Sequence, residues 1–130
     1  MTARLRLVVA DNDDDALELV VTDLALEGHD VVAAVASGDE AVAACAALHP
    51  DVLVSDFRMP PGPDGVAVAE AVRDVDPSIR VVLYSNYVRP ALIEAARRAG
   101  ALVVPKGDLR DLRKVVSGQR DGDVRSDQRE

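Results

Sequence analysis

The feature that most constrains this chain is a repeated alternation between short apolar runs and longer segments with helical periodicity. The runs are continuous in hydrophobicity, which is typical of parallel strands that are buried on both faces. We predict strands at residues 5–10, 31–35, 52–55, 81–84 and 101–104. Because a helical segment follows each strand, the sequence predicts an α/β fold in which a doubly wound parallel sheet carries helices on both faces.

The segments between the runs carry the signals with which helices begin and end. We predict helices at residues 14–27, 38–48, 65–75, 90–99 and 109–117. Ser37 and Glu40 form a capping box before the second helix, and Asp108 suits the N-cap of the fifth. Gly28 and Gly100 follow the first and fourth helices, where a C-cap needs a left-handed backbone. Five helices are therefore expected to accompany the five strands.

Length and charge limit the class of protein. The 130 residues are enough for one domain, and the 48% of hydrophobic residues are enough for one packed core. The chain has 15 basic and 23 acidic residues, which gives a formal net charge of −8. Such a surface repels nucleic acid and anionic membranes. We therefore expect neither direct nucleic-acid binding nor membrane association by this segment.

The cysteine content and the two ends of the chain bear on location and domain limits. Cys45 is the only cysteine, which excludes an internal disulfide and fits a reducing compartment. No apolar run has membrane-spanning length and the first residues lack a secretory signal, so we expect a cytoplasmic protein. Residues 118–130 hold one apolar side chain among charged and small polar ones. We predict a domain over residues 1–117 and a disordered tail or linker over 118–130.

Polar side chains follow four of the predicted strands, at the point where each strand ends. Asp11 comes after the first strand and Asp56 after the third, while Ser85 follows the fourth and Lys106 follows the fifth. Ligands of open parallel sheets bind beyond these carboxyl ends. Two carboxylates, a hydroxyl and an ammonium on one edge are the groups that an acyl-phosphate site requires.

Four short motifs occur in order at these strand ends. They are Ala10-Asp11-Asn12, Asp56-Phe57-Arg58-Met59-Pro60 with Asp64-Gly65, Leu83-Tyr84-Ser85-Asn86, and Gly100-Ala101 with Lys106. Together they resemble the receiver domains of two-component response regulators, of the chemotaxis-regulator type, over residues 5–117. The resemblance implies a flavodoxin-like sheet with strand order 2-1-3-4-5 and five helices.

The resemblance implies that Asp56 is the phosphoacceptor, a nucleophile that takes a phosphoryl group from a histidine kinase or a phosphotransfer protein. Ser85 would then donate a hydrogen bond to the phosphoryl oxygens, and Lys106 would pair with them as a point charge. Such a domain is no enzyme toward a separate substrate, since it catalyses only its own phosphorylation and hydrolysis. Phosphorylation is expected to switch the face made by the fourth helix, fifth strand and fifth helix, which could also form a homodimer.

The resemblance also implies a Mg²⁺ site, because this cation prefers hard oxygen ligands. Asp11, Asp56 and the backbone carbonyl of Arg58 would be the ligands. Asn12 stands where the family usually has a second acidic ligand, so its neutral amide is expected to weaken Mg²⁺ binding. Asp13, which precedes the first helix, is expected to cap that helix rather than bind the metal.

Two other interpretations stay open. A receiver-like interaction module that is never phosphorylated would bind its partners constitutively, and Asn12 favours it. A phosphatase of the haloacid-dehalogenase type also uses a strand-end Asp nucleophile, but it needs a second Asp where this chain has Arg58. Val103 stands where receivers often carry the aromatic residue that moves on activation. These departures bear on metal binding and on transmission of the switch, and they leave the predicted fold unchanged.

Overall fold

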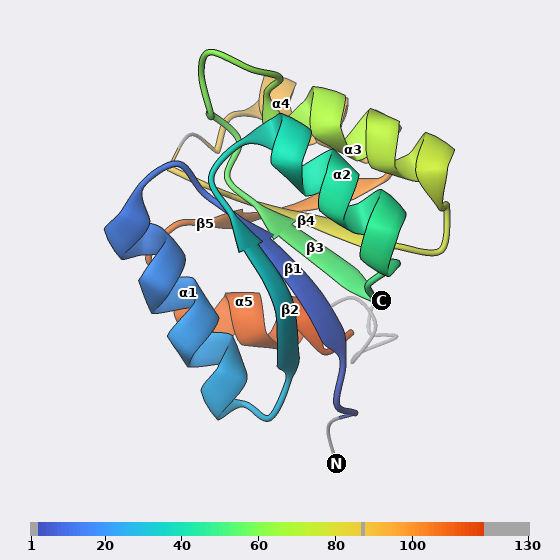
Figure 1. Ribbon diagram of the computed structural model, residues 1–130. Helices are drawn as coiled ribbons and strands as arrows, with labels where there is room; N and C mark the ends of the chain where they lie inside the picture. Colours follow the sequence, from blue (N-terminus) through green and yellow to red (C-terminus); the bar gives the residue numbers. More distant parts are fainter. Residues whose placement is uncertain (1–2, 87, 119–130) are drawn as a thin grey trace, which may run out of the picture.

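The computed structural model describes residues 3–86 and 88–118 and contains one parallel sheet with strand order β2-β1-β3-β4-β5 (Figure 1). The strands are β1 (Arg6–Ala10), β2 (Asp30–Val35), β3 (Val52–Ser55), β4 (Arg80–Ser85) and β5 (Ala101–Pro105). The helices are α1 (Asp14–Leu26), α2 (Gly38–Leu48), α3 (Gly65–Val75), α4 (Pro90–Arg98) and α5 (Leu109–Val116). The predicted α/β fold and strand order are confirmed. The predicted tail, apart from Gly118, lies outside the described residues.

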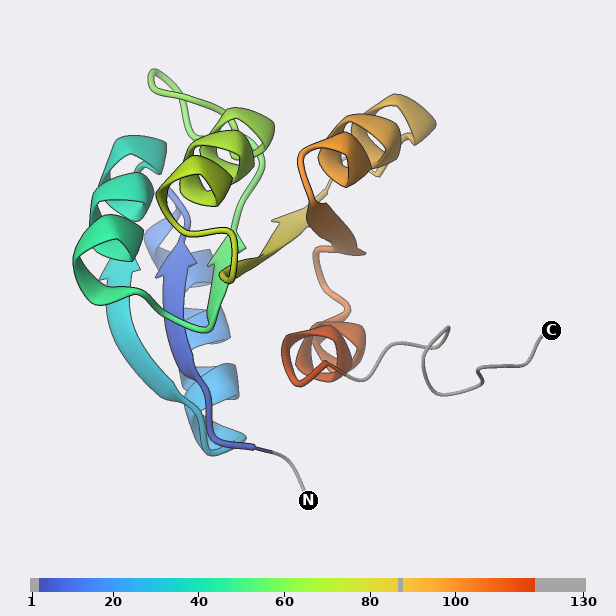
Figure 2. The same ribbon diagram turned by 90° about the vertical axis from the view of Figure 1, so that its right-hand side faces the viewer.

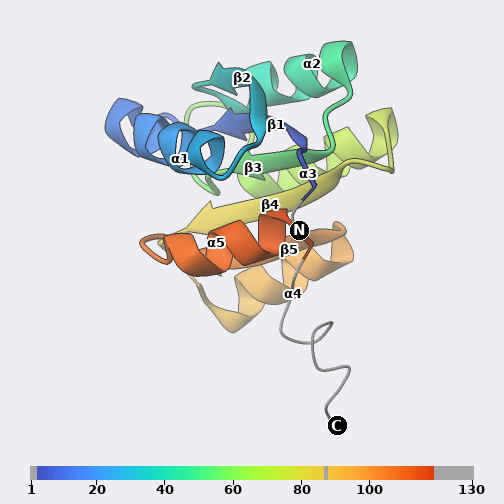
Figure 3. The same ribbon diagram turned by 90° about the horizontal axis from the view of Figure 1, so that it is seen from below.

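Helices cover both faces of the sheet (Figures 1 and 2). α1 and α5 pack on one face of the sheet, the face toward the viewer in Figure 3. α2, α3 and α4 pack on the other face. In β3, Leu53 belongs to the cluster under α2–α4, whereas Val52 and Val54 belong to the cluster under α1 and α5. All three side chains are buried, which explains why this strand reads as a continuous apolar run.

Side chains at the helix starts bond amides that would otherwise lack a partner within the helix. Asp13 caps α1, because its Oδ1 accepts hydrogen bonds from the amides of Asp15 and Ala16 at 2.9 and 3.2 Å. Asp108 caps α5 by accepting from the amide of Asp111 at 2.9 Å. The predicted capping roles of Asp13 and Asp108 are therefore confirmed.

The capping box before α2 differs from the prediction in one partner. Ser37 Oγ accepts a hydrogen bond from the amide of Glu40 at 3.1 Å, as expected. The Glu40 carboxylate accepts from the amide of Ala36 at 3.0 Å, one residue ahead of the N-cap. A flexible glutamate can reach either amide, so the sequence pattern alone does not choose between them. Gly28 and Gly100 have φ angles of 96° and 82°, which confirms the two left-handed helix ends.

The core contains the single cysteine. Cys45 is fully buried, and it belongs to the cluster of buried residues under α2–α4. Burial, with a smaller contribution from the charge of Asp76, raises the pKa of the Cys45 thiol to about 11. The thiol is therefore a small core residue, as predicted. Within residues 3–86 and 88–118, no helix combines the length and the apolar character that crossing a membrane requires.

His29 is buried at the amino edge of the sheet, and the residue is only 6% exposed. Its Nδ1 accepts a hydrogen bond from the amide of Leu5 at 3.1 Å, just ahead of β1. The amide of the next residue, Asp30, donates to the carbonyl of Leu5 at 2.8 Å, so these contacts join the starts of β1 and β2. Burial lowers the pKa of His29, although the charge of Glu27 acts in the opposite direction.

We predict that protonation of His29 destabilises the protein. Folding lowers its pKa, so the unfolded chain binds the proton more readily, and the free energy of unfolding should decrease as the pH falls below about 6.5. His29→Gln should flatten this decrease. His49→Gln is the control: it removes the other histidine, which lies at the surface in contact with Asp76 at 2.9 Å, and it leaves His29 in place, so the decrease should remain. Urea unfolding between about pH 8 and about pH 5 measures both; equal pH slopes for the wild type and His29→Gln would contradict the prediction.

Candidate functional site

The ends of β1 and β3 bring two carboxylates together at the carboxyl edge of the sheet. The two strands are neighbours, and their last pair in register is Ala10 with Ser55. Asp11 and Asp56 are the next residues on each strand. The amide of Asp56 donates to the carbonyl of Ala10 at 2.8 Å, which extends the pairing one step beyond the strands. The parallel sheet therefore fixes these two acids side by side.

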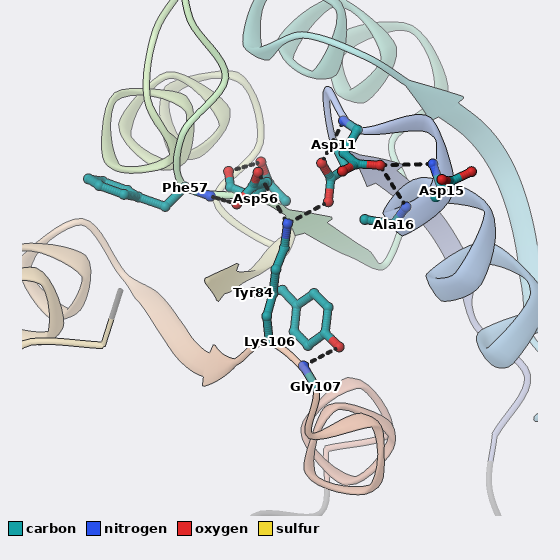
Figure 4. A network of polar contacts seen from close by, with 10 residues as sticks. Asp11, Asp15, Ala16, Asp56, Phe57, Tyr84, Lys106 and Gly107 are labelled. Carbon is teal, nitrogen blue, oxygen red and sulfur yellow. Dashed lines mark hydrogen bonds and ion pairs between the residues drawn. The ribbon is translucent and has the colours of Figure 1, made fainter. Parts of the chain in front are cut away.

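A lysine from the edge strand β5 reaches both acids (Figure 4). Lys106 Nζ lies 3.0 Å from Asp11 Oδ2 and 3.4 Å from Asp56 Oδ2. Lys106 follows β5, which is separated from β3 by β4, so its long side chain spans the width of a strand. Its amide donates to the carbonyl of Ser85 at 2.8 Å, and this bond fixes the lysine backbone to the end of β4.

Backbone amides orient the two carboxylates. Asp11 Oδ1 accepts a hydrogen bond from the amide of Asp13 at 2.9 Å. Asp56 Oδ1 accepts from the amide of Phe57 at 2.8 Å. In each carboxylate, one oxygen is held by the chain and the other faces the ammonium of Lys106. The site is thus preorganised to place two anionic oxygens around one positive centre.

Burial of the three charged side chains strengthens the electrostatic interactions between them. The side chains of Asp11, Asp56 and Lys106 are 4%, 12% and 16% exposed. Burial and the charge of Asp11 raise the pKa of Asp56, while Lys106 and the Phe57 amide act in the opposite direction. Burial alone would lower the pKa of Lys106, but its contacts with Asp11 and Asp56 outweigh that effect and raise it. Lys106 is therefore protonated at neutral pH, and with both acids ionised the three side chains carry one net negative charge.

The loop after Asp56 depends on a glycine at the start of α3. The amide of Gly65 donates to the carbonyl of Phe57 at 2.7 Å, so the loop closes tightly. A Cβ at position 65 would lie 2.9 Å from Leu83 Cδ2 and 3.1 Å from the carbonyl oxygen of Asp56. Any side chain here would push against the backbone of the phosphoacceptor candidate. Asp64 caps α3 by accepting a hydrogen bond from the amide of Ala67 at 2.9 Å. The Asp64-Gly65 pair therefore has a packing cause as well as a capping one.

The structure places the other predicted site residues on the same edge. Ser85 ends β4 and is buried, and Arg58 lies in the loop two residues after Asp56. Asn12 follows Asp11 directly and is exposed. Lys106 contacts both Asp11 and Asp56, and its amide donates to the backbone carbonyl of Ser85.

The oxygen atoms present fit a magnesium ion with few protein ligands. Mg²⁺ keeps several waters and often takes only one or two carboxylates. Asp11 and Asp56 each place one oxygen within 3.4 Å of the same positively charged atom, so both can face a single cation. Within the described part of the chain, no three His, Cys, Asp or Glu side chains are grouped to hold a metal. Asn12, which follows Asp11 and is exposed, has a neutral amide that adds no charge to this set.

Sequence reasoning missed one contact of this edge. Tyr84 is buried in β4, and its hydroxyl accepts a hydrogen bond from the amide of Gly107 at 2.9 Å (Figure 4). A tyrosine within a buried strand must find a polar partner for its hydroxyl, and this rule signals that such a contact exists. The rule does not name the partner, which is 23 residues away along the chain.

The strand order and the charged groups at the carboxyl edge define a class, the flavodoxin-like α/β domains. Comparison with known proteins supplies the family within that class. The response regulator receiver domain matches residues 7–117. This chain belongs to the response regulator receiver domain family, and this membership replaces the phosphatase interpretation.

Relatives of known name agree with the family. The regulatory protein AtoC of Escherichia coli is 31% identical over 118 residues, which cover 89% of this chain and 25% of that protein. The transcriptional regulatory protein NarL of Mycobacterium tuberculosis is 39% identical over 99 residues, which cover 75% of this chain and 45% of that protein. The chain thus spans less than half the length of these relatives. The solved receiver domain of the M. tuberculosis NarL response regulator has a TM-score of 0.81 at 34% identity, over 90% of this chain and 98% of that one.

We predict that Asp56→Asn raises the melting temperature by a few degrees in metal-free buffer near neutral pH. The pKa of Asp56 is raised by folding, so its ionised form opposes folding above its ordinary pKa, and a neutral amide removes that cost. Glu18→Gln removes an equal charge from an exposed position of α1 and should leave the melting temperature nearly unchanged. Thermal unfolding followed by circular dichroism compares the three proteins. A lower melting temperature for Asp56→Asn would show that the attraction of Lys106 outweighs burial.

Proposed function

We propose that this chain is a phosphoacceptor receiver domain, in which Asp56 takes a phosphoryl group from a histidine kinase or a phosphotransfer protein. One observation carries the proposal. A largely buried lysine directly after β5 contacts both strand-end carboxylates, at 3.0 and 3.4 Å, on the edge where open sheets bind their ligands. A merely structural ion pair would need one acid, whereas this lysine faces two that repel each other.

The transfer is a single displacement at phosphorus. One oxygen of the Asp56 carboxylate forms a bond to phosphorus while the bond between phosphorus and the donor histidine nitrogen breaks. The electron pair of the broken bond stays on that nitrogen, which takes a proton from solvent. The products are an acyl phosphate on Asp56 and a neutral histidine on the donor.

The other residues of the site compensate the negative charge that the phosphoryl group brings. A phosphoryl group that approaches two carboxylates meets repulsion of several kcal/mol at the low effective dielectric of a buried site. Bound Mg²⁺, held by Asp11, Asp56 and the Arg58 carbonyl, would supply positive charge to the phosphoryl oxygens. Lys106 pairs with the same oxygens, and the hydroxyl of Ser85 donates to another. Both residues already lie at this edge, so little reorganisation is needed.

The phosphorylated state is proposed to switch a protein interaction face formed by α4, β5 and α5. Ile93 on α4 is 45% exposed, so this helix presents an apolar side chain to solvent, where a partner or a second copy of the chain can contact it. The relatives include regulatory proteins, one of them named a transcriptional regulatory protein, of which this chain spans less than half. We propose that this domain controls such an effector, because a net charge of −8 is unsuited to direct DNA binding.

A second candidate function is constitutive interaction without phosphorylation. Asn12 favours it, because the neutral amide leaves only Asp11 and Asp56 as acids of the site. A site that binds Mg²⁺ weakly would take phosphate slowly, and the face of α4, β5 and α5 would then bind its partner in one fixed state.

We predict that a small phosphodonor with Mg²⁺ adds one labile phosphoryl group to the protein, as intact-mass spectrometry measures. Asp56→Asn should gain none, because an amide has no anionic oxygen to attack phosphorus. Glu18→Gln should be phosphorylated like the wild type. A wild type that gains no mass at saturating donor and Mg²⁺ would favour the constitutive module, and a modified Asp56→Asn would move the acceptor elsewhere.

We predict that Asn12→Asp tightens Mg²⁺ binding about tenfold or more. One further carboxylate adds an attraction on the order of 1–3 kcal/mol after desolvation. Without metal, the same change should lower the melting temperature, because it crowds Asp11 and Asp56 with a third negative charge. Mg²⁺ should then restore stability by binding the folded state.

The control for added charge is Asn86→Asp, which places a carboxylate at an exposed position on the same edge. It should change the Mg²⁺ affinity much less than Asn12→Asp. Titration of Mg²⁺ against thermal stability compares all three proteins. Equal metal dependence in the two variants would show that residue 12 does not reach the metal.

A further inference from the structure

Tyr84 lies directly before Ser85 on β4. It connects the functional site to the layer of the fold that is formed by α1 and α5. Its side chain is buried among the residues that α1 and α5 cover, together with Val82 and Val104. Its hydroxyl leaves this apolar cluster at the carboxyl edge of the sheet and bonds the amide of Gly107 at 2.9 Å. Figure 4 shows the ring beside the side chain of Lys106 and the hydroxyl at the turn that follows it.

The turn that carries Lys106 is fastened to β4 on both sides of the lysine Cα. The amide of Lys106 donates to the carbonyl of Ser85 at 2.8 Å, and the amide of Gly107 donates to the hydroxyl of Tyr84 at 2.9 Å. Pro105, the last residue of β5, has no amide hydrogen to donate. The two amides that follow it therefore attach the turn to β4, and consecutive β4 residues accept both.

We propose that Tyr84 is a positioning residue for Lys106: its hydroxyl fixes the turn and so holds the ammonium between Asp11 and Asp56. The lysine side chain is long and flexible, so the place of its nitrogen depends on where its backbone starts. A turn held at only one of the two amides would let the ammonium spread over a wider volume. The role in phosphoryl transfer rests on the proposed function, whereas the effect on the position of Lys106 does not.

The place of Tyr84 in the sheet connects the turn that carries Lys106 to the start of α5. Val103 of the neighbouring strand β5 packs with the cluster under α2–α4. Tyr84 lies on the opposite face of the sheet, and Gly107 leads directly into Asp108, the N-cap of α5. The hydroxyl of Tyr84 thus holds the segment that joins the site lysine to the start of α5.

Tyr84→Phe tests the proposal, because it removes the hydroxyl and keeps the ring in the core. Gly107 is exposed, so water can take over its amide and the protein should still fold. Amide hydrogen exchange at Gly107 should speed up by roughly threefold to tenfold, the range that one net hydrogen bond supports. Val82→Ala is the matched control, since it weakens the same face of the same strand without touching the turn.

Two measurements distinguish a role of Tyr84 in positioning Lys106 from a role in supporting the turn alone. In a double-mutant cycle on unfolding free energy, Tyr84→Phe should cost less in a Lys106→Met background than in the wild type, because the ammonium contacts that the fixed turn supports are then already absent. In phosphoryl uptake from a small donor at saturating Mg²⁺, Tyr84→Phe should be slower by roughly threefold to tenfold. Val82→Ala should keep the wild-type uptake rate.

The outcomes are distinct. An additive cycle together with a wild-type uptake rate, despite faster exchange at Gly107, would overturn the proposal and leave Tyr84 as a support for the turn. If the wild type itself takes no phosphate, the proposed function fails, and the cycle alone then decides whether Tyr84 positions Lys106. A non-additive cycle would uphold the positioning role in that case, and an additive one would overturn it.

Discussion

Two carboxylates at neighbouring strand ends repel each other, and one ammonium between them makes this edge of the sheet stable. β1 and β3 are paired side by side, so the sheet forces Asp11 and Asp56 together whatever their charges prefer. Lys106 contacts both, at 3.0 and 3.4 Å, and all three side chains are largely buried. Removal of the lysine would leave two like charges in a largely buried site without compensation, which typically costs about 3–5 kcal/mol. The surrounding structure is therefore arranged to hold that lysine.

The surrounding contacts come from several elements. The carbonyl of Ser85 holds the amide of Lys106, and the hydroxyl of Tyr84 holds the next amide along the chain. Gly65 lets α3 start close against the Asp56 loop, where a Cβ would collide with Leu83. Amides from the following loops turn one oxygen of each carboxylate away from the lysine and leave the other facing it. Preorganisation of this kind keeps charged groups in place without the help of water.

The site balances metal-free stability against metal binding. With Asn12 neutral and both acids ionised, two negative charges face one positive charge, so the side chains of Asp11, Asp56 and Lys106 together carry one net negative charge. A third acid would attract Mg²⁺ more strongly and would repel its neighbours more strongly when the metal is absent. The chain belongs to the receiver family, and the neutral side chain of Asn12 is expected to weaken the Mg²⁺ binding on which the proposed phosphorylation depends.

The sequence determined the elements and the edge on which the site lies, since every strand and helix was predicted to within one residue. The elements follow from local patterns, namely continuous apolar runs and helix caps. The edge follows from the rule that the carboxyl ends of parallel strands lie on the same side of the sheet. Only the tertiary structure decided which atoms meet. The choice of Ala36 as the partner of Glu40, the burial of His29 against Leu5 and the bond from Gly107 to Tyr84 are examples. The last two join residues more than 20 positions apart, and packing of the whole chain rather than local preference fixes their distances.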